Sequence, residues 1–140
     1  DKPYLVLRLH PKCEKREFEP YIEEFDQISQ KEPALDLIYA ADYVFGMTSM
    51  LLLEAIILGI PTFSILVREE EKKWLPITRL GLTNFSTNRD EIKMKMPKFL
   101  QNSPYLTKDQ IENYFIFGAS EKALLTIETI LQKTRKLDLN

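Results

Sequence analysis

The residues best suited to chemistry form a short turn, Gly46-Met47-Thr48-Ser49. A strand-like apolar run ends in this turn, and an apolar segment typical of a helix begins at Met50. Free N–H groups at a helix start bind phosphate, and the hydroxyls of Thr48 and Ser49 would add two donors. Gly46 allows a ligand to approach the backbone closely. The alternative is an ordinary helix cap without a ligand, which Thr48 and Ser49 satisfy equally well.

Glu54 is the second candidate, because its neighbours from Leu51 to Leu58 are otherwise apolar. A helix that is apolar on nearly every side is buried, and a buried carboxylate needs a partner. One interpretation is that Glu54 accepts hydrogen bonds from sugar or ribose hydroxyls. The other is a structural ion pair with one of three arginines, Arg8, Arg68 or Arg79.

His10 and Arg8 form the third candidate site, at the end of the apolar run Tyr4–His10. Side chains alternate along a strand, so Arg8 and His10 share one face near its carboxyl end. We expect both near a phosphate, where a protonated His10 would stabilise charge on a leaving nucleotide. The alternative is structural: His10 caps a neighbouring loop, and Arg8 pairs with an acidic side chain.

For two weaker features we favour a structural role over a functional one. Cys13 is a lone thiol, and nothing in the sequence marks it as activated. The stretch from Lys93 to Lys98 interleaves basic and apolar residues, which would suit weak peripheral contact with an anionic membrane surface. A solvated helix face is the favoured interpretation of that stretch.

The elements that must position these residues alternate between strand and helix. We expect strands at Tyr4–His10, Tyr43–Gly46 and Thr62–Leu66, with a weaker candidate at Asn84–Ser86. Helices are expected at about 17–26, 34–41, 50–58, 107–117 and 120–136, and from residue 88 or 89 to about 96, with a loop from 98 to 104. The near-continuous apolar sequence of Tyr4–His10 predicts a strand that is buried on both faces. This order predicts an α/β fold with a mostly parallel sheet, helices on both faces, and ligands at the carboxyl ends of the strands.

Composition excludes several classes of protein. With 140 residues, 44% hydrophobic and 29% charged, the chain is a globular domain rather than a disordered segment. A net charge of −2 disfavours nucleic acid as a partner. One cysteine and one histidine exclude an internal disulfide and argue against structural zinc. The most apolar region is interrupted by Glu54, Gly59 and Pro61, so no membrane-spanning helix is expected. We expect a cytoplasmic protein that needs no metal or cofactor.

Three motifs resemble the carboxyl-terminal half of GT-B glycosyltransferases. Residues 53–61, Leu-Glu-Ala-Ile-Ile-Leu-Gly-Ile-Pro, resemble that half's Leu-Glu-Ala-x-x-x-Gly-x-Pro segment. Residues 41–49 look like the strand and turn that precede it. Leu9-His10-Pro11 is similar to the His-Pro turn of several GT-B branches, including bacterial sialyltransferases and the related nucleotide-sugar 2-epimerases. The resemblance covers about residues 4–66.

The resemblance implies a Rossmann-like domain that binds a nucleotide-sugar donor, which is a substrate rather than a cofactor. It places Thr48 and Ser49 at the donor phosphates, Glu54 at a ribose or sugar hydroxyl, and His10, as the catalytic group, near the phosphate. Retaining members often carry another Glu eight residues before the position of Glu54. This chain has Gly46 at that place. Retaining chemistry of that type is therefore not implied.

The resemblance also implies that parts of the family fold are missing. The chain begins at what looks like the second strand of the family half, so the first strand, its glycine-rich loop and the following helix are lacking. We therefore interpret residues 1–140 as a single Rossmann-like domain, a fragment of a longer two-domain transferase whose acceptor-binding amino-terminal domain is absent. On this interpretation the fragment alone is inactive.

Other interpretations remain open. The chain could be a stand-alone, non-catalytic nucleotide or sugar binding module, or half of a nucleotide-sugar 2-epimerase. A flavodoxin-like regulator is weaker, because such proteins carry acidic residues after the first strand, where this chain has His10-Pro11-Lys12.

Overall fold

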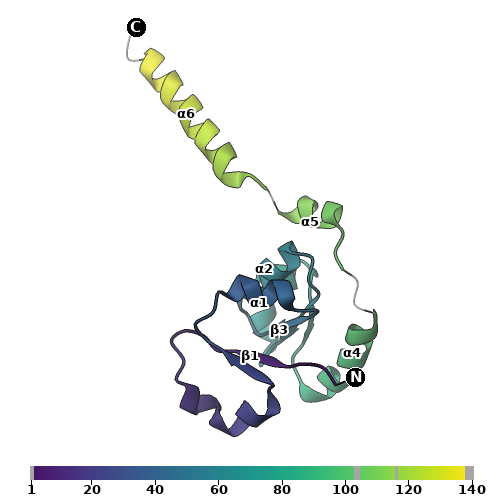
Figure 1. The fold of residues 1–140 in the computed structure, drawn as a ribbon. Coiled ribbons are helices and arrows are strands. Elements are labelled where there is room, and N and C mark those ends of the chain that lie inside the picture. The colour runs from purple at the N-terminus through teal and green to yellow at the C-terminus, as the bar shows by residue number, and fades with distance from the viewer. Residues whose placement is uncertain (1, 103–104, 116, 138–140) are drawn as a thin grey trace. The chain divides into compact units, whose positions relative to one another are not determined.

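The computed structural model describes residues 2–102, 105–115 and 117–137, with side chains described as far as residue 130. The chain divides into two compact units, Asp1–Tyr105 and Leu106–Asn140. The first unit carries every strand of the described chain and all the candidate site residues, and the second consists of helices (Figure 1).

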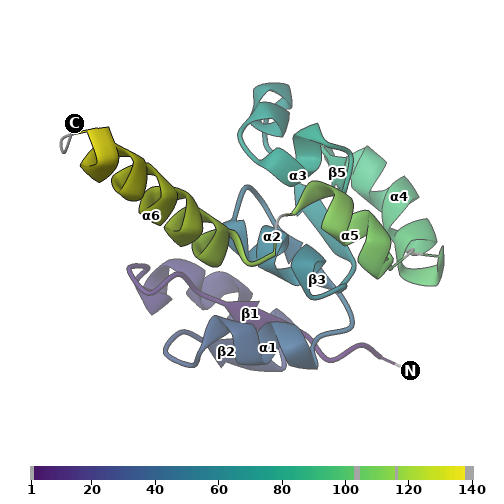
Figure 2. The same ribbon diagram turned by 90° about the horizontal axis from the view of Figure 1, so that it is seen from above.

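The strands of the first unit form two parallel sheets (Figures 1 and 2). Strand β1 (Val6–Arg8) pairs with β2 (Gln27–Ser29). Strands β3 (Val44–Gly46), β4 (Thr62–Ile65) and β5 (Asn84–Ser86) follow one another in a three-stranded sheet. The expectation of an α/β fold with parallel pairing is confirmed, but the strands form two sheets rather than one.

Helices connect the strands. They are η1 (Lys15–Glu24), α1 (Ala34–Ala40), α2 (Met50–Ile57), η2 (Glu69–Lys73), α3 (Pro76–Arg79) and α4 (Arg89–Asn102), of which η1 and η2 are 3₁₀ helices. Helix α2 begins where the sequence predicts, because the Ser49 hydroxyl accepts the backbone N–H of Leu51 at 3.2 Å. Gly59, with φ of 79°, follows its end.

Two helices cover opposite faces of the three-stranded sheet. A Cβ placed on Gly46 would lie 3.4 Å from the Leu52 side chain of α2. The ring of Phe45, the preceding residue, lies 5.9 Å from the ring of Phe99 on α4. Consecutive strand residues point to opposite faces, so α2 and α4 lie on opposite sides of β3. Helices on both faces are therefore confirmed for this sheet.

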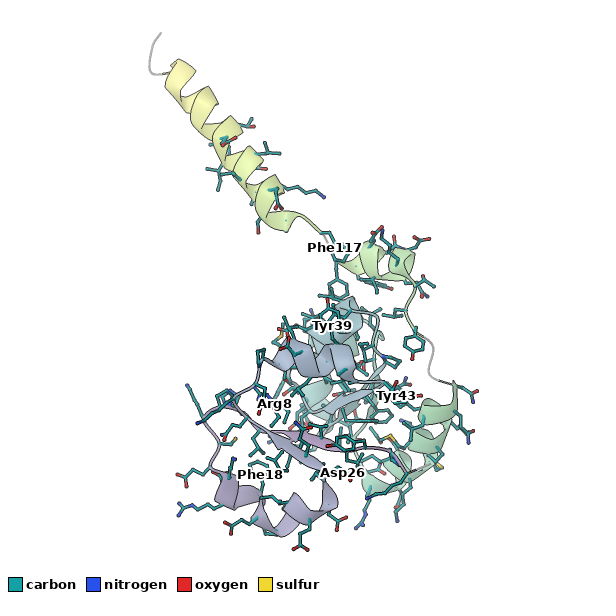
Figure 3. The ribbon with its side chains drawn as sticks, in the orientation of Figure 1. Arg8, Phe18, Asp26, Tyr39, Tyr43 and Phe117 are labelled. Atoms are coloured by element: carbon teal, nitrogen blue, oxygen red, sulfur yellow. The ribbon has the colours of Figure 1, made fainter. Side chains whose placement is uncertain are left out.

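Phe99 is the centre of an aromatic cluster beneath β3 and β4. Its ring lies 5.3 Å from that of Phe63, which is fully buried, and 5.5 Å from that of Tyr43. The hydroxyl of Tyr43, which is labelled in Figure 3, also donates to the carbonyl of Leu100 at 2.8 Å. The predicted loop from residue 98 is therefore wrong: α4 continues through Pro97 to Asn102, because this packing offsets the hydrogen bond that proline cannot donate.

The first strand differs most from expectation. Only Val6–Arg8 is strand, and Tyr4, Leu5 and Val6 are exposed, so the prediction of burial on both faces is wrong. Strand β2 was not predicted, because Gln27-Ile28-Ser29 has a single strongly apolar residue. The helix predicted at 17–26 is the 3₁₀ helix η1, which contains Pro20.

The second unit contains α5 (Lys108–Tyr114) and α6 (Ala119–Leu137), close to the predicted bounds. Thr107 caps α5 by accepting the N–H of Gln110 at 3.3 Å. Leu124, Leu125 and Ile127 on α6 are exposed. The side chain of Leu131, a further apolar residue of this helix, lies outside the described side chains.

Candidate functional site

The turn between β3 and α2 carries unused hydrogen-bond donors. The Ser64 hydroxyl of β4 donates to the Met47 carbonyl at 2.5 Å, which fixes the turn against the neighbouring strand. Ser49 caps α2 with its hydroxyl. Within the described chain, the Thr48 hydroxyl and the backbone N–H groups of Ser49 and Met50 have no protein acceptor. Such donors at a helix start suit an anion.

Glu54 lies in the second turn of α2 and is half-buried. Its carboxylate makes no hydrogen bond or ion pair with any residue that the structure describes. Of the arginines considered as partners, Arg8 contacts Glu32 and Arg68 contacts Glu71. The structural ion pair expected as an alternative is therefore not formed within the described residues.

Arg8 belongs to a closed network at the end of β2. Its Nη1 donates to the Ser29 hydroxyl at 2.9 Å, and that hydroxyl donates to Glu32 Oε2 at 2.6 Å. The backbone N–H of Gln30 donates to the same oxygen at 3.0 Å. The Ser29 hydrogen bond, followed by those from backbone N–H groups, lowers the pKa of Glu32 from 4.5 to about 2. Arg8, labelled in Figure 3, therefore pairs with the acidic side chain of Glu32, as the structural alternative predicts.

His10 is exposed and caps its own turn. Its Nδ1 accepts the backbone N–H of Lys12 at 3.2 Å, and its carbonyl accepts the N–H of Cys13 at 2.9 Å. The Gln30 side chain also donates to the carbonyls of His10 and Cys13, at 3.3 and 2.8 Å. Only Nε2 of the imidazole has no partner within the described structure, so it is the atom that could face a ligand.

The site residues form two groups on two sheets. Arg8 and His10 belong to the β1–β2 sheet, whereas Gly46, Thr48, Ser49 and Glu54 belong to β3 and α2. No hydrogen bond or ion pair among the described residues joins the two groups. The register pairs Gly46 with Ser64 and Ile65 with Ser86, so β3, β4 and β5 end at one edge.

Sequence analysis did not single out Glu71, which lies among the charged residues from Arg68 to Lys73. Its side chain is only 3% exposed, and it accepts the N–H of Val67 at 2.9 Å and Nε of Arg68 at 3.2 Å. The Val67 hydrogen bond is the largest influence lowering the pKa of Glu71, and burial opposes it. The Arg68 guanidinium lies 5.9 Å from the Trp74 ring centre.

A glutamate closes the carboxyl end of three strands. Glu32 accepts from Ser29 after β2, Glu71 from Val67 after β4, and Glu91 from the Ser86 hydroxyl after β5, at 2.7 Å. The shared signal is a glutamate three to five residues after the residue that donates to it. No such carboxylate closes β3 within the described chain, where Thr48 and Ser49 follow instead.

Comparison with family models, with curated proteins and with solved structures gives no match to this chain.

The described residues contain no group of three or more His, Cys, Asp or Glu side chains placed to hold a metal ion. Among the helices of the described ranges, none has the length and apolar character needed to cross a membrane.

Proposed function

We propose that this chain is the donor-binding part of a GT-B-type glycosyltransferase and binds a nucleotide-sugar through the β3–α2 turn. One observation carries the proposal: three strand ends are closed by glutamates, whereas the β3 end offers hydroxyl and N–H donors. A phosphate is repelled by carboxylates and attracted by a helix start. The β3 end is therefore the favoured place for a donor phosphate.

Each residue of the turn has a role in this proposal. The Thr48 hydroxyl and the N–H groups of Ser49 and Met50 donate to the phosphate oxygens. Gly46 keeps the end of β3 free of a side chain. The half-buried Glu54 accepts a ribose or sugar hydroxyl, because a carboxylate without a protein partner is best satisfied by such donors.

His10 acts on the leaving nucleotide through its Nε2, as an electrostatic group rather than as a base on the acceptor. In the parent protein, His10→Asn should lower turnover with only a modest change in donor affinity, because the contact strengthens as the bond breaks. Asparagine keeps an acceptor for the Lys12 N–H, so the turn is preserved. Unchanged turnover would leave His10 as a structural residue of the turn.

Transfer requires more than this chain. An acceptor and a base must be held against the anomeric carbon of the donor, and these groups come from a second domain of the longer, cytoplasmic parent protein. The 140 residues alone are therefore expected to bind the donor without transferring the sugar. Any membrane contact through residues 93–98 is peripheral and weak.

Calorimetric titration of the full chain with nucleoside monophosphate and diphosphate sugars, and with inorganic pyrophosphate, tests the proposal. The Ser49 hydroxyl accepts the Leu51 N–H and can still donate its own hydrogen to the phosphate. Ser49→Ala removes that donor and should weaken nucleotide binding by about 1.5–3 kcal/mol, the value of a hydrogen bond to a charged group. Glu54→Gln should weaken binding of nucleotide-sugars but spare pyrophosphate. Thr107→Ala removes a helix cap in the second unit and serves as the matched control, with unchanged affinity. Equal affinity of the Ser49 and Glu54 variants and the unaltered chain would overturn the proposal.

A further inference from the structure

Three serines are fully buried near the carboxyl ends of strands: Ser29 on β2, Ser64 on β4 and Ser86 on β5. A buried hydroxyl needs a hydrogen-bond partner, so each partner shows what the serine holds in place. The Ser29 hydroxyl donates to Glu32 at 2.6 Å, three residues further along the chain. The Ser86 hydroxyl donates to Glu91 at 2.7 Å, five residues further along. Both of these serines therefore close the end of their own strand.

Ser64 is used differently, because its partner belongs to the end of the neighbouring strand. Its hydroxyl donates at 2.5 Å to the carbonyl of Met47, which lies 17 residues earlier in the β3–α2 turn. Gly46 pairs with Ser64 in the register, and a Cβ on Gly46 would lie 3.4 Å from Leu52 of α2. Paired strand residues point to the same face of a sheet, so the Ser64 hydroxyl reaches the turn from the face that α2 covers. Its hydrogen bond therefore acts on the proposed donor site and not on the end of β4.

This hydrogen bond sets the direction of the peptide group between Met47 and Thr48. A trans peptide is planar, and its carbonyl oxygen and its N–H point in opposite directions. Since the Met47 carbonyl points to Ser64, the Thr48 N–H points away from β4, and it has no acceptor within the described chain. The Thr48 N–H therefore adds a third open donor to the N–H groups of Ser49 and Met50 at the start of α2.

The opposite orientation of this peptide would reverse the preference of the turn for an anion. The Met47 carbonyl oxygen, which is the negative end of the peptide dipole, would then take the place of the Thr48 N–H and repel a phosphate. That orientation would also leave the fully buried Ser64 hydroxyl without its acceptor, which costs free energy. Ser64 therefore favours the orientation of the peptide that attracts an anion.

We propose that Ser64 is a positioning residue of the donor site, which holds the peptide between Met47 and Thr48 with its N–H toward the donor phosphate. This role rests on the proposed function, because it requires that the β3–α2 turn binds a phosphate. Ser64 itself touches no ligand and acts only through the Met47 carbonyl. The three buried serines therefore differ in what they do: Ser64 acts on binding, whereas Ser29 and Ser86 act on stability alone.

The test compares Ser64→Ala with Ser86→Ala in the full chain. Both changes remove one hydroxyl from a fully buried strand position, so urea denaturation should show similar losses of stability. Calorimetric titration with inorganic pyrophosphate should show an affinity that is lower by about tenfold or more in Ser64→Ala and unchanged in Ser86→Ala. A general loss of packing would lower the affinity of both variants, so the difference between them is specific to the turn.

NMR of the same variants follows the peptide group itself. Without ligand, the carbonyl carbon of Met47 should shift upfield in Ser64→Ala, because it loses a hydrogen bond, and should not move in Ser86→Ala. With pyrophosphate, the Thr48 amide proton should move downfield in the unaltered chain and in Ser86→Ala, but not in Ser64→Ala. Ser64→Cys is a milder variant in case the alanine variant does not fold. Its S–H is a weak donor, so the same effects should appear in smaller size.

Two results would overturn the role of Ser64 and leave the proposed function standing. Equal pyrophosphate affinity in Ser64→Ala and Ser86→Ala would show that the turn binds without help from Ser64. An unchanged Met47 carbonyl shift in Ser64→Ala would show that the hydrogen bond is not maintained in solution. Failure of the unaltered chain to bind pyrophosphate would overturn the proposed function and the role of Ser64 together, so the two failures are distinguishable.

Discussion

The ends of β2 and β3 use similar residues in opposite ways. At the end of β2, the fully buried Ser29 joins Arg8 to Glu32, so each polar group has a protein partner. At the end of β3, Thr48 has no such partner and Ser49 uses its hydroxyl as a helix cap. A serine after a strand is thus not diagnostic by itself. The informative property is whether its surroundings leave donors unused.

This comparison separates stability from binding. A closed network stabilises the fold, because loss of Arg8 or Glu32 leaves the buried Ser29 hydroxyl without one of its hydrogen bonds. An unused donor at the surface adds little to stability and is available to a ligand. Substitutions at the β2 end should therefore change unfolding, and those at the β3 end should change nucleotide affinity.

The largest effect is expected for Ser49→Asp. Aspartate is as good a helix cap as serine, so the urea unfolding midpoint should change little. Its negative charge would face the donor phosphate, and nucleotide affinity should fall by about 100-fold or more, measured by calorimetry. A variant that is stable and binds nucleotide normally would contradict the placement of the phosphate at this turn.

Ser29→Ala should have the next largest effect, and on stability alone. It removes the hydroxyl that bridges Arg8 and Glu32 in a fully buried position, and the free energy of unfolding should fall by about 1–3 kcal/mol. Urea denaturation measures the change, and nucleotide affinity should stay as in the unaltered chain. The contrast between the two strand ends fails if Ser29→Ala weakens nucleotide binding without lowering stability.

Thr48→Val tests the same contrast with an isosteric change at the β3 end. Loss of one hydroxyl donor should weaken nucleotide binding by about 1 kcal/mol. The free energy of unfolding should change by no more than about 0.5 kcal/mol, because the hydroxyl has no protein partner within the described chain. A large loss of stability would show that Thr48 is a structural residue.

Acid should lower the stability of the fold by protonating the glutamates that close the strand ends. The pKa of Glu32 is about 2 when folded and about 4.5 otherwise, so its stabilisation is full above pH 4.5 and is lost as pH falls toward 2. The pKa values of Glu71 and Glu91 are lowered as well. In Glu91 the main cause is the hydrogen bond from Ser86. Protonation of these two carboxylates therefore adds to the loss of stability in acid. Urea unfolding at pH 5, 3.5 and 2.5 should show the decline.

Glu32→Gln is the variant that isolates the contribution of this carboxylate. It cannot ionise, so its stability should fall less between pH 5 and pH 2.5 than that of the unaltered chain. Parallel declines in the two proteins would mean that the Ser29–Glu32 hydrogen bond is not maintained in solution.

The sequence by itself determined the local elements of this fold. Helix α2 begins after Ser49 and ends before Gly59, as the cap residue and the positive φ of glycine require. Apolar runs separated by helical segments correctly gave β3, β4 and the parallel pairing. These features depend on residues close to one another in the chain, so propensity and pattern are sufficient to predict them.

The tertiary structure decided which polar groups are used and which strands are covered. Arg8 finds its partner Ser29 21 residues away, and Glu71 is buried inside a run of charges. Helix α4 continues through Pro97 because Phe99 packs against rings from β3 and β4. β1 is exposed despite its apolar sequence, since no strand in the described chain pairs with its outer edge. Each of these outcomes depends on partners distant in the sequence, and local pattern carries no information about where such partners lie.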